Sequence, residues 1–171
     1  MLVKKTIKGI VAIGDGNVIG REGTLPWRRI DEDMTYFYRK TRGCAVVFGR
    51  RTALGMQDVF PLKERENLVL STQAESAVRN ELKGEYKICD SWKEVFDKCE
   101  SDTLWVGGGS EVYSSGAKFI DEFHVSRIRK KHFTQDKNVS YTRWSFPTDK
   151  TWVLNNRQEK ENVCIEIYRR I

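Results

Sequence analysis

The stretch "LWVGGGSEVYSSG", residues 104–116, joins an apolar run to three consecutive glycines and then to a segment with helical spacing. An apolar run that passes through a short turn straight into a helix is typical of one strand–helix unit of a parallel sheet. The glycines would let a phosphate approach the backbone N–H groups at the helix start. A tight strand-to-helix turn with no ligand explains the glycines equally well. The stretch therefore indicates a parallel α/β fold but leaves open whether it binds a ligand.

The same alternation recurs along the chain. Helical patterns lie between several apolar runs up to residue 120, for example in 31–42 and in 91–100, where Ser91 and Glu94 have capping-box spacing. The last runs follow one another without a helix, which predicts an antiparallel edge. We therefore expect a single domain, residues 1–171, with a three-layer α/β fold and a mainly parallel central sheet of about eight strands. The predicted strands are 7–13, 44–48, 67–72, 86–89, 103–106, 122–128, 151–155 and 162–168.

Composition and charge narrow the class of protein. The 171 residues are 39% hydrophobic and carry 30 basic against 24 acidic side chains, a net charge of +6. The basic residues are spread along the chain, which favours anionic small ligands over nucleic acid. No apolar segment approaches transmembrane length, so no membrane association is expected.

The cysteines and histidines point to a reducing compartment without a structural metal. No CxxC pair occurs, and only two histidines are available, so no zinc spacing emerges. Most of the cysteines lie in or beside apolar runs, which predicts buried free thiols and a cytoplasmic location. The residues concerned are Cys44, Cys89, Cys99, Cys164, His124 and His132.

A second glycine-rich stretch, "GDGNVIGREGTLPWRRIDEDM" (14–34), tests the dinucleotide-binding fingerprint. That motif needs G-x-G-x-x-G with a helix opening on the last glycine. Here Gly14, Gly16 and Gly20 have a different spacing, and Pro26 follows before any helix can start. The fingerprint is therefore absent, and the stretch predicts a mobile flap, with an ordinary surface loop as the alternative.

The helix that follows carries an acidic residue beside its apolar face. At about 100° per residue, with Asp33 at 0°, Phe37 falls at about 40° and Ile30 at about 60°, whereas Glu32 falls at about 260°. A carboxylate held next to apolar side chains is poorly solvated, which is typical of functional sites. We interpret Asp33 as functional and Glu32 as an acid that complements the helix dipole.

Two further strand ends carry groups suited to an anion. The run "VVFGRRT" (46–52) places two arginines and a threonine after one strand, and "LVLSTQ" (68–73) ends another in two hydroxyls. Ligands of open α/β sheets gather at the carboxyl ends of strands. Together with 104–116, these segments predict a site for one phosphate-rich ligand.

At this point the chain resembles the dihydrofolate reductase family over nearly its whole length. The resemblance rests on an ordered series of motifs, each weak alone. They are "IVAIGDGNVIG", "LPW", the helix with Asp33, Phe37 and Thr41, "FGRRT", Leu62-x-x-Arg65, "LVLST", Gly108-Gly109-x-x-x-Tyr113 and "CIEIY"; "VSRIRKKH" (125–132) is also similar to some phage-encoded members.

The resemblance implies NADPH-dependent reduction of 7,8-dihydrofolate, with antifolate-type inhibitors as further ligands. Asp33 matches the carboxylate that holds the pteridine, Ser126 the residue that hydrogen-bonds it, and Trp27 a third catalytic position. Arg65 matches the arginine that receives the α-carboxylate of the folate glutamate, a role suited to its planar fork. The remaining substrate positions are Ile10, Ala12, Met34, Phe37, Tyr38, Met56 and Leu62.

The same resemblance assigns the NADPH contacts and no metal. The flap and Ala12 match the nicotinamide side, the glycine turn the pyrophosphate, and the arginines with the strand-end hydroxyls the adenosine and its 2′-phosphate. The positions are Ala12, Val18, Ile19, Gly20, Gly23, Thr24, Arg50, Arg51, Thr52, Leu70, Ser71, Thr72, Gly107, Gly108, Gly109, Ser110, Glu111, Val112 and Tyr113.

Three departures from the family pattern are visible. Asp33 lies six positions after Trp27, where many bacterial members have five. Gly107 stands where a branched aliphatic residue is common, which predicts a looser strand end. The stretch "YTRWSFP" (141–147) replaces the usual Gly-Asp-Thr-x-Phe-Pro, so the acidic partner of the flap is missing and the closed arrangement of the flap is in question.

Two alternative functions remain open. One is a related NADPH reductase of riboflavin synthesis, which shares the fold; Trp27, Asp33 and Arg65 together argue against it. The other is a folate-binding structural or assembly protein. Thymidylate synthase or assembly partners are the protein partners that the resemblance suggests.

Overall fold

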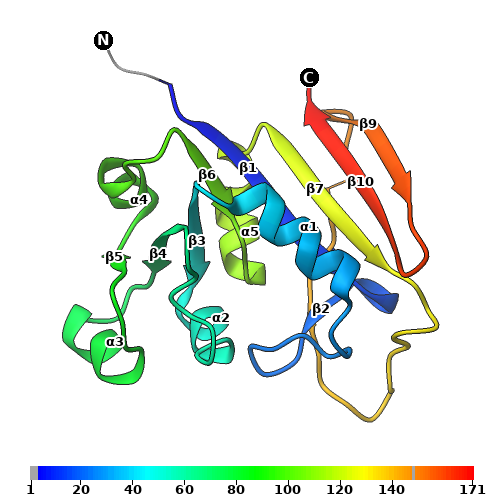
Figure 1. The fold of residues 1–171 in the computed structure, drawn as a ribbon, viewed down its shortest axis with the longest axis horizontal. Helices are drawn as coiled ribbons and strands as arrows, with labels where there is room; N and C mark the ends of the chain where they lie inside the picture. Colours follow the sequence, from blue (N-terminus) through cyan, green and yellow to red (C-terminus); the bar gives the residue numbers. More distant parts are fainter. Residues whose placement is uncertain (1–3, 148) are drawn as a thin grey trace.

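An eight-stranded sheet forms the centre of the molecule (Figure 1). The computed structural model describes residues 4–147 and 149–171. The strand order is β5-β4-β3-β6-β1-β7-β10-β9. The strands are β1 (Thr6–Ile13), β3 (Ala45–Gly49), β4 (Glu66–Leu70), β5 (Lys87–Cys89), β6 (Thr103–Val106), β7 (Glu122–Ile128), β9 (Trp152–Glu159) and β10 (Val163–Arg170).

The predicted sheet type is confirmed. Strands β5, β4, β3, β6, β1 and β7 pair in parallel, while β10 runs antiparallel to both β7 and β9. The parallel strands are covered on both faces, which is why they read as continuous apolar runs rather than alternating ones. Val46 and Val47 point to opposite faces, and both have no exposed surface.

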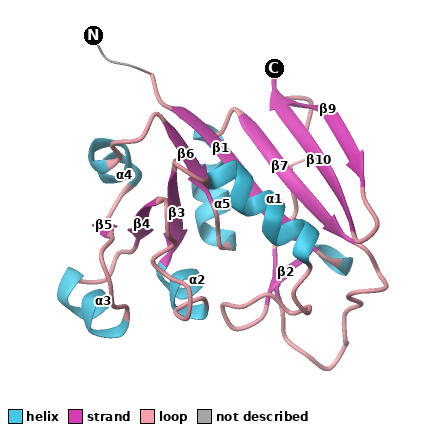
Figure 2. Ribbon diagram, in the orientation of Figure 1, coloured by secondary structure: helices cyan, strands magenta, loops and turns pink. Residues whose placement is uncertain are grey.

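Helices cover both faces of the sheet (Figure 2). Val46 and Phe48 pack in one core with residues of the first three helices, while Ala45 and Val47 pack in another with residues of the last two. The three layers are therefore as predicted. The helices are α1 (Asp31–Thr41), α2 (Arg50–Gly55), α3 (Glu75–Glu81), α4 (Trp92–Lys98) and α5 (Ser110–Gly116), with short 3-10 turns η1 (Asp15–Asn17) and η2 (Ala117–Phe119).

The predicted helix ends rest on identifiable local contacts. Ser91 caps α4 because its hydroxyl oxygen accepts a hydrogen bond from the backbone N–H of Glu94 at 3.2 Å. The carboxylate of Glu94 reaches back one residue further than a capping box requires, to the N–H of Asp90 at 2.9 Å. Helix α1 ends before Gly43, whose φ of 75° is the left-handed conformation that glycine adopts most readily.

The flap is more ordered than the sequence suggests. Residues 18–20, predicted as part of a loop, form strand β2 (Val18–Gly20), which pairs antiparallel with β8 (Thr142–Arg143). Val18 has no exposed surface and Ile19 only 9%. The prediction of a loop from Val18 onward was therefore wrong, because two short strands far apart in the sequence meet and bury this apolar pair.

The four cysteines are free thiols, with Cys89, Cys99 and Cys164 buried and Cys44 partly buried, as predicted. Burial raises the pKa of the Cys89 thiol to about 11, which keeps it protonated and unreactive at neutral pH. Within residues 4–147 and 149–171, no helix has the length and apolar character that crossing a membrane requires.

Candidate active site

Helix α1 brings Asp33 down onto strand β7. Asp33 is 6% exposed and accepts a hydrogen bond from the side chain of Ser126, which is 2% exposed. Glu32 lies on another side of the helix, where its carboxylate accepts a hydrogen bond from the backbone N–H of Asn162 at 3.0 Å. The predicted helix register is confirmed: the acid that faces the sheet is Asp33.

The surroundings of Asp33 favour its neutral form. Burial raises the pKa of the Asp33 carboxyl above its ordinary value, and the hydrogen bond from Ser126 offsets this only in part. Burial also raises the pKa of the Tyr113 hydroxyl, with a smaller contribution from the negative charge of Asp33. That hydroxyl donates to the carbonyl oxygen of Ile10 at 2.7 Å, which ties α5 to the central strand β1.

The predicted apolar wall is assembled from β1, α1 and the segment after α2. Ile10 and Leu62 are buried in the same core against which Phe37 and Met56 pack, and Met34 is half-buried. The side chain of Asn67 holds the backbone of Leu62, donating to its carbonyl and accepting from its N–H, both at 2.9 Å. A continuous apolar surface therefore begins beside Asp33.

Trp27 closes this surface at the start of α1. It is 8% exposed and meets the ring of Phe133 edge-on, with 5.5 Å between centroids. Ile30 and Val18 belong to the same core, and the half-buried Ala12 packs against it. The structure thus brings Trp27, Asp33 and Ser126 to one end of α1.

Arg65 lies at the other end of the apolar surface, where other residues of the chain hold its guanidinium in place. Its Nε donates to the carbonyl of Lys63 at 2.7 Å and its Nη1 to the hydroxyl of Thr41 at 3.1 Å. The guanidinium carbon lies 5.9 Å from the ring centroid of Phe37 and 5.4 Å from that of Tyr38. A guanidinium held in this way keeps donors available for a carboxylate.

The three predicted strand ends are neighbours, because β3 lies between β4 and β6. The backbone N–H of Gly49, at the end of β3, donates to the carbonyl of Gly108, after β6, at 2.7 Å. Gly108 has a φ of 112°, which side chains rarely adopt, and a Cβ on Gly109 would lie 3.0 Å from the hydroxyl of Thr52. Backbone and hydroxyl groups therefore crowd together where the diphosphate of a dinucleotide cofactor would need them, and the residues present fit such a group.

The adenosine side of the predicted cofactor site differs in one respect from the sequence interpretation. Arg50 is not a free cation: its Nη1 lies 2.7 Å from a carboxylate oxygen of Glu81 in α3. Arg51 and Thr72 are exposed, and Leu70 and Ser71 are half-buried. Arg51 is therefore the more available cation for a phosphate, while Arg50 also connects α2 to α3.

Gly107 does not loosen its strand end. A Cβ at this position would lie 2.4 Å from the ring of Phe48 on the neighbouring strand β3. The aromatic ring fills the space that a branched side chain would take, so the expectation of looser packing was wrong.

The remaining turn of the flap packs directly on α2. A Cβ on Gly55 would lie 1.9 Å from the carbonyl oxygen of Gly23, and one on Gly23 would lie 2.7 Å from the carbonyl oxygen of Arg51. On the other side, Arg143 Nη1 donates to the carbonyl of Gly16 at 2.7 Å, and the backbone N–H of Trp144 donates to that of Asn17 at 2.9 Å. The "YTRWSFP" segment thus holds the flap through an arginine and backbone groups, without the usual acidic partner.

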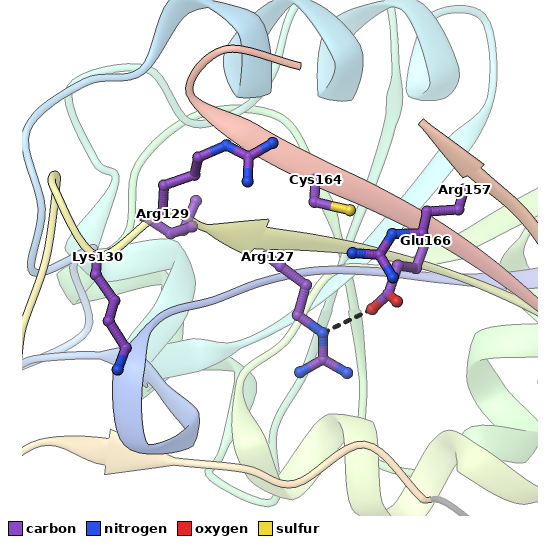
Figure 3. A pocket seen from close by; sticks show the side chains of 7 residues that line it. Arg127, Arg129, Lys130, Arg157, Cys164 and Glu166 are labelled. Carbon is purple, nitrogen blue, oxygen red and sulfur yellow. Dashed lines mark hydrogen bonds and ion pairs between the residues drawn. The ribbon is translucent and has the colours of Figure 1, made fainter. Parts of the chain in front are cut away.

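A hollow of about 490 Å³ lies between the end of β7 and the C-terminal hairpin (Figure 3). Arg127 alternates with Ser126 along β7 and so faces away from Asp33. Three of the four cations that line this hollow form ion pairs, but with only two carboxylates: Arg127 lies 2.8 Å from Glu166, and Arg129 and Arg157 lie 2.6 and 2.7 Å from the same residue, Glu159. The pair of Arg127 with Glu166 joins β7 to β10, and the hollow is separate from the candidate site.

Comparisons with known proteins agree with this geometry. A sequence model of the family described as "Dihydrofolate reductase" matches residues 6–170. The chain belongs to the dihydrofolate reductase family. Members of this family reduce dihydrofolate with NADPH, and this is the reaction of the present chain.

Individual relatives cover most of this dihydrofolate reductase. The enzyme of Mycobacterium leprae is 31% identical over 151 residues, 86% of each chain, and that of Gallus gallus is 29% identical over 188 aligned positions, 97% of each chain. Among solved structures, the dihydrofolate reductase of Enterococcus faecalis, complexed with NADP(H) and RAB-propyl, is similar with a TM-score of 0.76 and 25% identity. That similarity covers 99% of both chains.

The sequence did not reveal every polar residue near the site. Within the described residues, His124 of β7 is buried at 3% exposure, and its ring contacts Tyr36 of α1 and Glu122. A single histidine in an apolar run gives no sign of these partners. Glu64 was also missed; it hydrogen-bonds the hydroxyl of Tyr38 beside Arg65, and its φ of 61° is unusual for a residue with a side chain.

Proposed function

We propose that Asp33 is the group that orients the pteridine ring of dihydrofolate. One observation carries this proposal: the Asp33 carboxylate is only 6% exposed and accepts a hydrogen bond from Ser126. It lies at the edge of an apolar surface that leads to Arg65. A buried carboxylate that receives two donors from a planar ring forms a strong, directional pair. Asp33 lies near the start of α1, and Arg65 contacts Thr41 at the end of that helix. This arrangement suits a ligand that is polar at both ends and apolar between them.

NADPH, when bound, supplies the hydride for this reaction. We propose that Gly49, Gly108, Gly109 and Thr52 hold its diphosphate, and that the flap covers its nicotinamide end. The remaining cofactor positions are proposed from the family resemblance: Ala12, Val18, Ile19, Gly20, Gly23, Thr24, Arg50, Arg51, Leu70, Ser71, Thr72, Gly107, Ser110, Glu111, Val112 and Tyr113.

The protein residues act on the substrate by binding and by electrostatics. The negative charge of Asp33 favours the protonated pteridine as electron density builds on N5, which is a form of preorganised stabilisation. We propose that water delivers the proton, because both ring nitrogens of His124 are already engaged by Tyr36 and Glu122. The access of other water to the pteridine ring is reduced by Trp27, Phe133 and the flap.

The test is the loss of NADPH absorbance by purified protein with dihydrofolate, compared with the same assay on a pyrimidinone substrate of the riboflavin pathway. Turnover with dihydrofolate alone supports the proposal. Turnover with the riboflavin-pathway substrate alone favours that alternative, and binding of dihydrofolate without turnover favours a structural role. Three further proposals rest on family resemblance or composition: a single functional domain over 1–171, a cytoplasmic location, and contact with thymidylate synthase or assembly partners.

A further inference from the structure

Two side-chain pairs join α1 to β7 in adjacent rows. Along β7, His124 lies two residues before Ser126, so the two side chains emerge on the same face of the sheet. Along α1, Tyr36 lies three residues after Asp33, so these two side chains point to the same side of the helix. The pairs are Asp33 with Ser126 and Tyr36 with His124.

The hydrogen-bond direction in the second pair follows from its outer partner. Nε2 of His124 lies 2.6 Å from Oε1 of Glu122, and an ionised carboxylate can only accept. Nε2 therefore carries the proton, which leaves the lone pair of Nδ1 free. The hydroxyl of Tyr36 lies 2.5 Å from Nδ1 and donates to it. The chain Tyr36 to His124 to Glu122 thus has one defined direction.

Charged groups from neighbouring elements anchor the far end of this chain. Glu122 lies 3.5 Å from Nζ of Lys8 in β1 and 3.2 Å from Nε of Arg169 in β10. Lys40 of α1 lies 5.5 Å from the ring centroid of Tyr36, and the ring of Trp105 in β6 meets His124 at 4.9 Å. Because these groups hold Glu122 on the sheet, the hydrogen bond to Tyr36 holds α1 against a fixed point.

The protonation states support a fixed arrangement at neutral pH. Burial lowers the pKa of the His124 imidazole, although Glu122 opposes this, so the ring stays neutral. Glu122 has a lowered pKa: burial raises it, but the bond from His124 and the charges of Lys8 and Arg169 together outweigh that effect. Burial, with a further contribution from the charge of Glu122, raises the pKa of the Tyr36 hydroxyl, which therefore remains a donor.

We propose that Tyr36 and His124 are positioning residues for Asp33: their hydrogen bond fixes the register of α1 on β7 and so sets the Asp33–Ser126 contact. This inference rests on the proposed role of Asp33. The hydroxyl of Tyr36 touches neither substrate nor cofactor in this scheme. It acts through the helix, one turn away from the carboxylate.

The test measures the pKa of the Asp33 carboxyl directly, by carbon-13 NMR of the ligand-free protein, together with the pH dependence of kcat/KM for dihydrofolate. Ser126→Ala is the reference, since losing its bond removes an interaction that lowers the pKa of Asp33. A lost hydrogen bond of ordinary strength shifts a pKa upward by ~0.4–1 unit. Tyr36→Phe is expected to shift it in the same direction by a measurable fraction of that amount, with the acidic limb of kcat/KM moving likewise.

The matched control is Tyr86→Phe. Tyr86 is a buried tyrosine, at 7% exposure, and its hydroxyl donates to the carbonyl of Leu82 at the end of α3 at 2.5 Å, so this bond does not join α1 to β7. This variant removes the same atom and is expected to leave the pKa of Asp33 unchanged. Two variants of His124 separate the loss of the hydrogen bond from misfolding. His124→Asn keeps an acceptor near the position of Nδ1 and should have the wild-type pKa of Asp33. His124→Gln loses that acceptor and should shift the pKa of Asp33.

Each outcome bears on one claim. If Tyr36→Phe and His124→Gln leave the pKa of Asp33 at its wild-type value while Ser126→Ala moves it, the positioning inference is overturned and the role of Asp33 stands. If Ser126→Ala shifts the pKa of Asp33 in the NMR titration but leaves the pH profile of kcat/KM unchanged, the proposed role of Asp33 fails instead.

Discussion

Asp33 shows how one residue can be unfavourable for stability and necessary for chemistry. Ionising its carboxyl group is costly, because burial removes water and Ser126 supplies only one hydrogen bond in return. Asp33→Asn should therefore keep the fold and NADPH binding but depress turnover at neutral pH. Help with proton delivery of this kind contributes roughly 10²–10⁴-fold, and activity should recover partly at low pH, where the substrate is already protonated.

The control for this variant is Glu32→Gln, which keeps an oxygen that can accept from the N–H of Asn162. It should alter steady-state turnover little. A severe loss in Glu32→Gln with a mild one in Asp33→Asn would contradict the assignment of the pteridine-binding acid.

Asp33→Asn should also raise the free energy of unfolding, by an amount that depends on pH. The pKa of Asp33 is higher in the folded protein than its ordinary value of 3.8, so the folded state loses stability as pH rises from 3.8 through the folded pKa. Asp33→Asn removes that loss. Urea denaturation should show the variant more stable than wild type at pH 7, with the difference shrinking toward zero below pH 3.8. A constant difference at all pH values would point to packing rather than charge.

Arg65 is prepared for a carboxylate by its contacts with Lys63 and Thr41. Arg65→Leu should raise KM for dihydrofolate and leave NADPH affinity nearly unchanged. Truncating one partner of a hydrogen-bonded charge pair costs about 2–5 kcal/mol. Steady-state kinetics with a dihydropteroate lacking the glutamate provide the comparison: an equal loss with that substrate would mean that Arg65 binds another part of the ligand.

Among the helices, α2 carries the cations of the proposed 2′-phosphate site, and α3 supplies a carboxylate that pairs with one of them. Arg50 is paired with Glu81, and Arg51 is exposed, so both cations lie at the start of α2 but only one is free of a partner among the described residues. Replacing Arg50 and Arg51 with glutamine should lower kcat/KM for NADPH far more than for NADH, which lacks the 2′-phosphate. Replacing Arg51 alone should cause the larger part of this loss in kcat/KM for NADPH. An unchanged NADPH-to-NADH ratio would move the phosphate site elsewhere.

The elements that sequence reasoning predicted are those whose signal is local. The periodicity of 31–42 placed Asp33 on the correct face of α1, and the apolar runs predicted the strands of the large sheet. Strand β2 escaped because it is three residues long and pairs with β8, two residues long and more than a hundred positions away. No local pattern encodes such a pairing. The ion pair between Arg50 and Glu81 escaped for the same reason, since it depends on how α3 folds back onto α2.

In the molecule as a whole, the segment that follows β8 packs against the strand that carries Ser126. Aromatic residues of 144–152 pack behind β7, on the face opposite α1. Phe123 is fully buried at their centre, with ring centroids of Trp144 and Phe146 both at 5.4 Å and Trp152 at 6.2 Å. The strand that presents Ser126 to Asp33 is thus supported from behind by the same segment that continues from β8, the partner of the flap.

This arrangement predicts that the aromatic core supports global stability and the flap together. Phe123→Ala should lower the free energy of unfolding by about 3–5 kcal/mol, because a buried ring leaves a cavity that its neighbours fill only in part. Hydrogen exchange should also quicken at the amides of Val18 and Gly20, since β8 loses its support. Phe119→Ala is the comparison, because Phe119 is half-buried and contacts Trp92 and Phe96 on the side of α4. It should cost less stability and leave those two amides unchanged; faster exchange there in both variants would show that the flap responds to overall stability rather than to the core behind β7.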